Sequence, residues 1–348
     1  MTSAVPSPVL VVGCGLIGTS VALALAERGS QVHLEDRDPR NVQVAAEAGA
    51  GTGAPVEAPE LVVVATPPAA VVPAVEEALR RFPDAVVTDV ASVKAAIVEA
   101  VDDARFVGGH PMAGKERSGP TAGSGQLFEG RSWAIVPGRR TEQSSIDLLE
   151  RTVIELGAVP RRFAPRAHDE AVALVSHVPH LMANLTASLL EGAPDGHVDL
   201  AGQGLRDVTR IARSDADLWV DILSHNSSAI TPLLTTLRDR LDTLIDAVGE
   251  DPSAVDGLLK QGRAGTTTIP GKHGDLPTDV ASVFVPIDDT PGELSRLFGD
   301  AAEVVNIEDL RIDHEVGRPV GLVEIVVLSG RADTLVEAMR AKGWSAYR

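Results

Sequence analysis

Two segments of the chain carry residues that could perform acid–base chemistry. His110 lies in GGHPMAGKERSG and Ser92 lies in DVASVK, and each segment directly follows a short apolar run. If those runs are parallel strands, both residues meet at the carboxyl edge of a sheet, where α/β proteins hold their ligands. A histidine there can accept a hydroxyl proton while hydride leaves the same carbon. We expect Ser92 to hold the imidazole in the correct tautomer; a purely structural histidine beside a proline is the alternative.

Three arginines recur at helical spacing in GLRDVTRIARS. If residues 205–213 are helical, Arg206, Arg210 and Arg213 lie on one face. A planar guanidinium group binds a carboxylate through two parallel hydrogen bonds, so this face suits a carboxylate substrate. The alternative is a solvated face whose arginines pair with neighbouring aspartates.

Two histidines, His177 and His180, are three positions apart in SHVPH. A metal site would need a third ligand, for which His168 with Asp169 is the only candidate. Core or substrate-facing histidines are the favoured interpretation, and we expect no metal.

Gly13, Gly15 and Gly18 form the pattern GxGxxG between a β-branched run and a helical segment. In that context the first glycine allows a tight turn, the second lets a pyrophosphate approach the backbone, and the third lets helix and strand pack closely. The helix start at Leu16 and Ile17 then faces the phosphates. We expect a dinucleotide here; a glycine turn without a ligand is the alternative.

An acidic residue, Asp36, follows the second apolar run and can bind the ribose hydroxyls of NAD while repelling a 2′-phosphate. Arg37 beside it could soften that preference and admit NADP, and Glu35 is a rival for the ribose role. Thr66 and Pro67 end the third run at the same edge, where ordinary turn chemistry is the alternative.

These residues require a sheet to bring them together. Alternating short apolar runs and helical patterns over the first 165 residues predict a doubly wound α/β sheet of the Rossmann type. The predicted strands, continuous and mostly β-branched as in parallel sheets, are Val9–Val12, Gln31–Glu35, Leu61–Ala65, Ala85–Thr88, Phe106–Val107, Ser132–Val136 and Val159–Phe163. The predicted helices are Ile17–Arg28, Asn41–Ala48, Ala69–Arg81, Val93–Asp102 and Glu142–Leu156.

Strand signals disappear after Pro165, and long helical periodicity replaces them. Residues 168–191 and 216–248 predict long helices, which Pro179 and Pro232 should kink or begin. Their apolar residues exceed what one face of a lone helix needs, so we expect this all-helical region to form a homodimer.

The last part of the chain has a βαββαβ order, which is typical of a ferredoxin-like fold. Its predicted elements are Val280–Ile287, Gly292–Ala302, Asn306–Glu315, Gly321–Leu328, Ala332–Lys342 and Trp344–Tyr347. The predicted division is a dinucleotide-binding domain at 1–165, a helical substrate and dimerisation domain at 166–265, a Gly/Thr/Pro-rich linker at 266–277 and a small domain at 278–348.

Composition restricts the partners. The 348 residues carry a formal net charge of −18, which disfavours nucleic acid and anionic membranes. Residues 9–26 lack charge, but their glycines divide them into a strand and a helix start, so we expect no membrane span. The single cysteine, Cys14, excludes an internal disulfide and indicates a reducing cytoplasm.

Taken together over about residues 9–275, GxGxxG, DVASVK, GGHPMAGKERSG, SHVPH and GLRDVTRIARSDADLWVDI resemble the prephenate/arogenate dehydrogenase family. Its members make the tyrosine precursor by NAD(P)-dependent oxidative decarboxylation of a cyclohexadienol. The resemblance implies that His110 is the catalytic base and that Ser92 supports it.

The same resemblance implies the substrate contacts. His180 matches a histidine on the substrate side, and Arg210 matches an arginine that grips a substrate carboxylate, with Asp207 as its ionic neighbour. Glu116 matches an acidic gate, although Lys115 stands where some relatives have a small polar residue.

The implied reaction converts prephenate to 4-hydroxyphenylpyruvate with NAD. Arogenate is the alternative substrate, because Glu116 could pair with its ammonium group. A β-hydroxyacid dehydrogenase is disfavoured, since the helical region lacks that family's KxxxN. A non-catalytic amino-acid sensor that keeps the dinucleotide as a ligand is a more distant alternative.

The small C-terminal domain, with DDTPGEL and Asn306-Ile307, resembles an ACT domain, an amino-acid-sensing module. The resemblance implies a regulatory site at Thr290, Pro291, Gly292 and Asn306, with tyrosine as effector. The alternative is that this domain only holds a dimer together.

Overall fold

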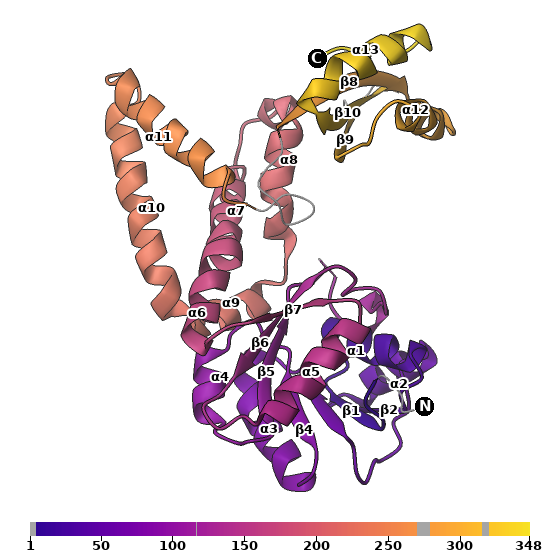
Figure 1. Ribbon diagram of the computed structural model, residues 1–348. Helices are drawn as coiled ribbons and strands as arrows, with labels where there is room; N and C mark the ends of the chain where they lie inside the picture. Colours follow the sequence, from indigo (N-terminus) through magenta and orange to yellow (C-terminus); the bar gives the residue numbers. More distant parts are fainter. Residues whose placement is uncertain (1–4, 116, 270–278, 315–319) are drawn as a thin grey trace. The chain divides into compact units, whose positions relative to one another are not determined.

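A seven-stranded sheet organises the first part of the computed structural model, which describes residues 5–115, 117–269, 279–314 and 320–348 (Figure 1). The strand order is β2-β1-β3-β4-β5-β6-β7. Parallel pairing joins all neighbours except β5 and β6, which are antiparallel. The strands are β1 Val9–Val12, β2 Val32–Glu35, β3 Leu61–Val64, β4 Val86–Asp89, β5 Phe106–Pro111, β6 Ser132–Pro137 and β7 Val159–Arg162.

The sheet is covered on both faces, as a doubly wound fold requires. Successive strand residues point to opposite sides, so Val9 and Val11 join one hydrophobic core while Leu10 joins the other. Helices α1 (Leu16–Glu27), α2 (Pro39–Glu47) and α5 (Gln143–Glu155) supply the first core, and α3 (Pro68–Arg81) and α4 (Ala95–Ala100) supply the second. Both faces of the strands are therefore buried, which explains their continuous apolar character.

One strand departs from the predicted parallel order. Between β5 and β6 the described residues form no crossover α-helix, only the short 3₁₀ turn Pro120–Ala122. A parallel neighbour needs a long crossover connection, usually a helix, whereas an antiparallel one does not. Strand β6 therefore pairs with β5 in the antiparallel sense.

The helical region begins with α6 (Pro165–Val172), which continues through a π-helical turn at Ala173–His177 into α7 (Val178–Ser188). The π turn ends two residues before Pro179, the second residue of α7, which supports the expectation of a disturbance there. Further along lie a 3₁₀ turn, η3, and helix α8, followed by a second 3₁₀ turn, η4. Their bounds are η3 His197–Leu200, α8 Gln203–Thr209 and η4 Arg210–Arg213.

The predicted single helix over 216–248 is two helices, α9 (Ala216–His225) and α10 (Ser227–Ala247). The interruption falls at Asn226, whose side chain is buried and hydrogen-bonded to other segments. Helix α11 (Pro252–Thr266) follows, so the first residue assigned to the linker is helical, while residues 270–278 lie outside the described part.

The C-terminal part contains a three-stranded antiparallel sheet of order β8-β10-β9 with two α-helices. An isolated bridge between Phe284 and Tyr347 adds the last predicted strand as a single residue pair. Alternate residues of the strands pack on the helices in a separate core. The elements are β8 Val280–Asp288, α12 Glu293–Ala302, β9 Asp309–His314, β10 Val320–Leu328, the 3₁₀ turn Ser329–Arg331 and α13 Ala332–Ala341.

By its contacts the chain divides into two compact units. The first comprises residues 1–188 and 209–236, and the second comprises residues 189–208 and 237–348. The sheet of seven strands and the helices from α6 to α9, except most of α8, belong to the first unit. Among the described residues, no helix is long and apolar enough to cross a membrane.

Candidate functional site

The loop between β1 and α1 has the backbone that a dinucleotide needs. Gly13 has φ +101°, and a Cβ there would lie 2.4 Å from the carbonyl oxygen of Ala65. A Cβ on Gly18 would lie 1.8 Å from the oxygen of Gly13, so helix and strand can approach only without it. By contrast, a Cβ on Gly15 would meet nothing within 4 Å. The space over Gly15, at the uncapped N-terminus of α1, is where a pyrophosphate fits.

Asp36, at the end of β2, is tied to this loop. Its carboxylate accepts hydrogen bonds from the backbone N–H of Cys14 at 2.6 Å and of Asp38 at 2.8 Å. The rival acid Glu35 instead forms an ion pair with Arg81 at 3.0 Å. Arg37 is exposed beside them. The geometry therefore favours Asp36 over Glu35 as the acid beside the glycine loop.

A buried hydroxyl lies at the end of β3. The Oγ1 atom of Thr66 has no hydrogen-bond partner among the described residues. Its backbone N–H lies next to Gly13, since a Cβ on that glycine would be 3.2 Å from the Thr66 nitrogen. Pro67 follows as the N-cap of α3. A free hydroxyl and an open glycine surface together fit a bound dinucleotide.

His110 lies at the carboxyl end of β5, at the same sheet edge, with its ring buried. Its Nδ1 is 2.9 Å from Nε2 of His168. Burial, the neighbouring His168 and then Lys94 and His177 lower the pKa of His110 well below 6.5. The ring is therefore neutral at physiological pH and able to accept a proton.

The partner of His110 is held by a carboxylate. His168 Nδ1 lies 2.8 Å from Oδ1 of Asp169, and both residues are buried. Asp169 also accepts the backbone N–H groups of Lys94 at 2.8 Å and Ala95 at 2.9 Å. Burial alone would raise the pKa of Asp169, but these hydrogen bonds together lower it below its ordinary value.

A buried ion pair lies under the same edge. Lys94 Nζ pairs with Asp89, whose carboxylate also accepts the N–H groups of Ala91 at 3.0 Å and Gly109 at 3.3 Å. Burial lowers the pKa of Lys94, and the attraction of Asp89 opposes that shift. The pair fixes the loop after β4 and the strand that carries His110 to each other.

Ser92 does not form the contact that the sequence led us to expect. Among the described residues the recorded partner of His110 Nδ1 is His168, and no hydrogen bond joins Ser92 to His110. The serine lies half-buried in the same loop as Lys94. His168, and not Ser92, is thus the neighbour of His110 Nδ1, and the supporting role expected of Ser92 stays a prediction.

A second cluster surrounds His180. Its ring stacks on Trp219 with centroids 3.5 Å apart and planes at 5°. Its Nε2 is 3.0 Å from the amide nitrogen of Asn184, which makes Nε2 the acceptor and Nδ1 the protonated nitrogen. That Nδ1 is buried without a partner among the described residues, and burial lowers the pKa of the ring. It is an unsatisfied donor suited to a bound polar group.

Asn226 links this cluster to the base. Its amide nitrogen donates to the carbonyl oxygen of Asp169 at 2.8 Å and lies 3.1 Å from Nδ1 of His177. Burial lowers the pKa of His177 to about 4, so this ring is also neutral and can accept. In the described part of the chain, no cluster of His, Cys, Asp and Glu forms a metal site.

The arginines do not share one α-helical face, because α8 ends at Thr209 and a 3₁₀ turn follows. Arg210 and Arg213 lie in that turn at i and i+3, where 3₁₀ side chains eclipse. The turn packs against α7, which carries His180, and neither arginine has an ion-pair partner among the residues described. The predicted continuous face was wrong, although two of its arginines remain side by side.

Two further predicted residues precede this turn. Arg206 donates to the carbonyl oxygen of Ala201 at 3.4 Å, and Asp207 accepts from Gln203 Nε2 at 3.0 Å. Both lie in the second compact unit. Their roles toward a substrate stay predictions. Glu116, the predicted gate, lies outside the described residues.

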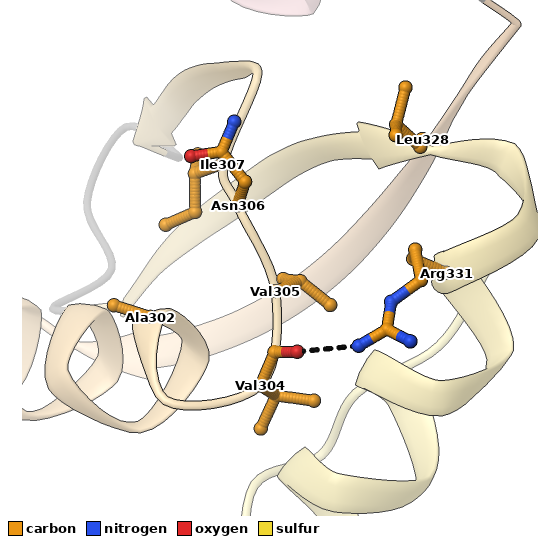
Figure 2. A pocket seen from close by; sticks show the side chains of 7 residues that line it. All are labelled: Ala302, Val304, Val305, Asn306, Ile307, Leu328 and Arg331. Atoms are coloured by element: carbon orange, nitrogen blue, oxygen red, sulfur yellow. Dashed lines mark hydrogen bonds between the residues drawn. The ribbon is translucent and has the colours of Figure 1, made fainter.

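The predicted regulatory residues of the C-terminal part lie in two different places. Thr290, Pro291 and Gly292 form the turn after β8, with Gly292 at φ +98° as the N-cap of α12. Asn306 follows α12, which returns the chain to the other end of β8. There it lines an open pocket of about 640 Å³ (Figure 2). The lining residues are Ala302, Val304, Val305, Asn306, Ile307, Leu328 and Arg331.

Arg331 gives this pocket its charge. Its guanidinium group donates to the carbonyl oxygen of Val304 at 2.8 Å, which holds it at the rim (Figure 2). No acidic side chain pairs with it among the described residues. An apolar wall with one guanidinium and one amide suits a small carboxylate with an apolar body.

Sequence reasoning missed several residues of the site. His168 and Asp169 were considered only as metal ligands, and Trp219 and Asn226 only as helix residues. Trp219 lies in the motif GLRDVTRIARSDADLWVDI and Asn226 shortly after it, whereas His168 and Asp169 lie outside that motif. The contacts of His110 with His168 and of Asn226 with Asp169 span more than 50 positions and cannot be deduced from spacing.

Comparisons with known proteins agree with this geometry. The family described as prephenate dehydrogenase, nucleotide-binding domain, matches residues 21–161, and the family described as prephenate dehydrogenase, dimerization domain, matches residues 164–260. A probable prephenate dehydrogenase, NovF, from Streptomyces niveus is 32% identical, with 97% of this chain and 98% of that protein covered. The prephenate dehydrogenase of Bacillus subtilis is 28% identical, with 87% of each chain covered.

Solved structures give the same result. The prephenate dehydrogenase of A. aeolicus, determined with hydroxyphenyl propionate and NAD⁺, superposes with a TM-score of 0.68 at 29% identity, covering 75% of this chain and 98% of that one. The arogenate dehydrogenase of Synechocystis superposes with a TM-score of 0.63 at 27% identity, covering 75% and 100%. From its matched domains, its full-length relatives and its fold, the chain belongs to the prephenate dehydrogenase family.

Proposed function

We propose that this protein catalyses the NAD-dependent oxidative decarboxylation of prephenate to 4-hydroxyphenylpyruvate. The observation that carries the proposal is the neutral, buried His110 at the sheet edge that also holds the glycine loop. A base at that edge can act on a hydroxyl whose carbon faces the nicotinamide. Membership of the family supplies the substrate class.

The cofactor site favours NAD over NADP. Asp36 would accept the ribose hydroxyls, and Gly15 leaves the pyrophosphate room beside the N-terminus of α1. When bound, NAD⁺ supplies the acceptor for the hydride that leaves ring carbon C4 of the substrate. Arg37 is exposed, but a 2′-phosphate would also face the carboxylate of Asp36.

The remaining side chains bind and orient the substrate. Prephenate carries two carboxylates, and Arg210 and Arg213, which have no ion-pair partner in the described part of the chain, offer guanidinium groups beside the helix of His180. The buried Nδ1–H of His180 provides a further donor, and Trp219 holds its ring in place. Fixing the ring in this way lets His110 meet the C4 hydroxyl, an effect of orientation.

Arogenate is the second candidate, since one family relative is named an arogenate dehydrogenase. The two substrates differ in one side-chain group, a keto group against an amino group. Steady-state kinetics with each substrate and NAD⁺, followed at the absorbance of NADH, decides between them. A higher kcat/KM for prephenate supports the proposal, a higher value for arogenate replaces the substrate, and no turnover with either refutes the activity.

The assembly is proposed to be a homodimer formed by the helical region. The matching family is a dimerization domain, and α10 and α11 expose large apolar side chains. Those side chains include Leu241, Ile245 and Leu259.

The compartment we propose is the reducing cytoplasm, because the single cysteine, Cys14, is a free and buried thiol.

The C-terminal sheet is proposed to be an ACT-type regulatory domain with tyrosine as effector. Its strand and helix order agrees with that fold. The pocket with Arg331 and Asn306 could bind the carboxylate and the side chain of an amino acid. The turn at Thr290–Gly292, at the other end of β8, is the alternative location.

A further inference from the structure

Asp169, His168 and His110 are linked by consecutive hydrogen bonds, and the direction of these bonds is determined at Asp169. Asp169 accepts the backbone N–H groups of Lys94 and Ala95, which can only donate. An ionised carboxylate in turn can only accept. His168 must therefore carry a proton on Nδ1 and donate it to Asp169 at 2.8 Å.

The proton on Nδ1 of His168 in turn determines which nitrogen of His110 donates. When His168 carries no proton other than the one on Nδ1, its Nε2 has a lone pair. That atom is 2.9 Å from Nδ1 of His110, so the His110 nitrogen must donate. The second nitrogen of His110, Nε2, is then left with a free lone pair.

We propose that His168, held by Asp169, is a positioning residue that keeps His110 in the Nδ1–H tautomer and so makes Nε2 the atom that receives the substrate proton. The inference rests on the proposed dehydrogenase function. In the opposite tautomer Nε2 would carry a hydrogen toward the substrate hydroxyl and could not accept its proton. The second ring thus determines whether the first can act as a base.

The proton balance of the step is complete within these groups. The O–H bond of the C4 hydroxyl breaks and an N–H bond forms on Nε2 of His110, while the hydride from C4 passes to the bound NAD⁺. His110 becomes an imidazolium that still donates from Nδ1 to His168. The carboxylate of Asp169 behind His168 stabilises that positive charge without taking the proton itself.

The other charged groups around His110 cannot replace His168. Lys94 forms an ion pair with Asp89, and its ammonium group can donate a hydrogen bond but cannot accept one. His177 is neutral, with a pKa of about 4, and its Nδ1 is engaged by the amide of Asn226. Within the described part of the chain, the His110 ring forms its hydrogen bond with His168.

Two substitutions in the full-length enzyme test the role in turnover. His168→Leu removes the acceptor at similar volume, and we expect kcat with prephenate and NAD⁺ to fall about 10²–10³-fold, short of the roughly 10⁴-fold loss that a wrong tautomer causes in a serine protease. KM for prephenate should stay within about threefold, since His168 acts through His110 and not on the substrate. His168→Gln, whose Oε1 can accept from Nδ1, should recover at least about tenfold in kcat.

The matched control is His225→Gln, on an exposed histidine of α9 whose partner among the described residues is Asp221 of the same helix. It should leave kcat unchanged. If His168→Leu keeps kcat within threefold of wild type, or if the Gln variant is no better than a correctly folded Leu variant, His168 does not position the base.

A second readout needs no turnover. Histidine ¹⁵N NMR of the intact protein, with the His110 signals assigned by their loss in His110→Asn, reports which nitrogen is protonated. We expect Nδ1 of His110 to be protonated in wild type and the proton to shift toward Nε2 in His168→Leu. Protonation at Nε2 in wild type would overturn the proposal, whereas the expected tautomer in a protein that does not oxidise prephenate would refute the function alone.

Discussion

At the scale of single residues, burial and neighbouring charges determine what each titratable group can do. His110 is buried beside His168 and Lys94, and all three effects lower the pKa of the imidazole. Because the neutral ring is the base, protonation removes activity. We therefore expect kcat to stay level as the pH falls from 8 through 6.5, and to decline only well below 6.5. An acid limb centred at or above 6.5 would contradict the burial of the base.

Replacing the base tests it directly. His110→Asn keeps a polar side chain without a basic nitrogen, and we expect kcat to fall about 10²–10⁴-fold, the usual contribution of a positioned acid–base group. KM for NAD⁺ should change little, because the glycine loop and Asp36 are untouched. A variant that keeps more than a third of the wild-type kcat would exclude His110 as the base.

The ribose acid has a matched control one position away. Asp36→Asn should erode the preference for NAD⁺ over NADP⁺, since the carboxylate that would repel a 2′-phosphate is gone. Glu35→Gln should leave the ratio intact, because Glu35 is engaged with Arg81. The ratio of kcat/KM for the two cofactors measures both. If Glu35→Gln changes the ratio and Asp36→Asn does not, Glu35 binds the ribose.

At the scale of elements, the turn from β1 into α1 separates binding from folding within one motif. A methyl group on Gly15 enters open space, so Gly15→Ala should leave the melting temperature unchanged and raise KM for NAD⁺. A methyl group on Gly18 would lie 1.8 Å from a backbone oxygen, so Gly18→Ala should lower the melting temperature itself. Melting curves and NAD⁺ titrations of both variants check this, and equal KM values for wild type and Gly15→Ala would contradict it.

The strands could be predicted from sequence because their signal is local. Continuous β-branched runs such as Val9–Val12 and Leu61–Val64 are buried on both faces, and their bounds agree with the prediction within a residue. The antiparallel sense of β6 was not predictable in the same way, since it depends on the connection and not on the strand. The break at Asn226 likewise depends on partners far away in the sequence.

Only the part of the site that depends on local sequence signals could be predicted. His110 and the glycine loop lie at strand ends, so the topology alone brings them to one edge. The pairing of His110 with His168 joins residues 58 positions apart, and no spacing rule predicts it. The prediction that Arg206, Arg210 and Arg213 share one helical face was wrong, because α8 ends at Thr209 and a 3₁₀ turn follows.

At the scale of the whole molecule, the proposed regulation means that tyrosine bound at the C-terminal sheet inhibits the dehydrogenase reaction. If the pocket beside Val304 binds tyrosine, Arg331→Ala should abolish tyrosine inhibition in the full-length protein and leave kcat unchanged. Coupling between an effector site and a substrate site typically changes the apparent affinity for substrate about 5–150-fold, and we expect the effect of tyrosine to lie in that range. Arg348→Ala, on an exposed arginine paired with Asp333, is the control. Equal inhibition of wild type and Arg331→Ala would place the inhibition elsewhere, at the active site or at the Thr290–Gly292 turn.

The association state belongs to the same scale. The exposed apolar side chains of α10 and α11 predict a dimer, so light scattering at micromolar concentration should give twice the 36.3 kDa of one chain. A particle of 36.3 kDa would contradict a dimer.

The central claim is that this protein couples the oxidation of prephenate to its decarboxylation. The most direct measurement follows NADH, CO₂ and 4-hydroxyphenylpyruvate together after wild-type protein is mixed with prephenate and NAD⁺. We predict that the three appear in equal amounts and that all three vanish together in His110→Asn. NADH formed without CO₂, or products formed at an equal rate by the His110 variant, would contradict it.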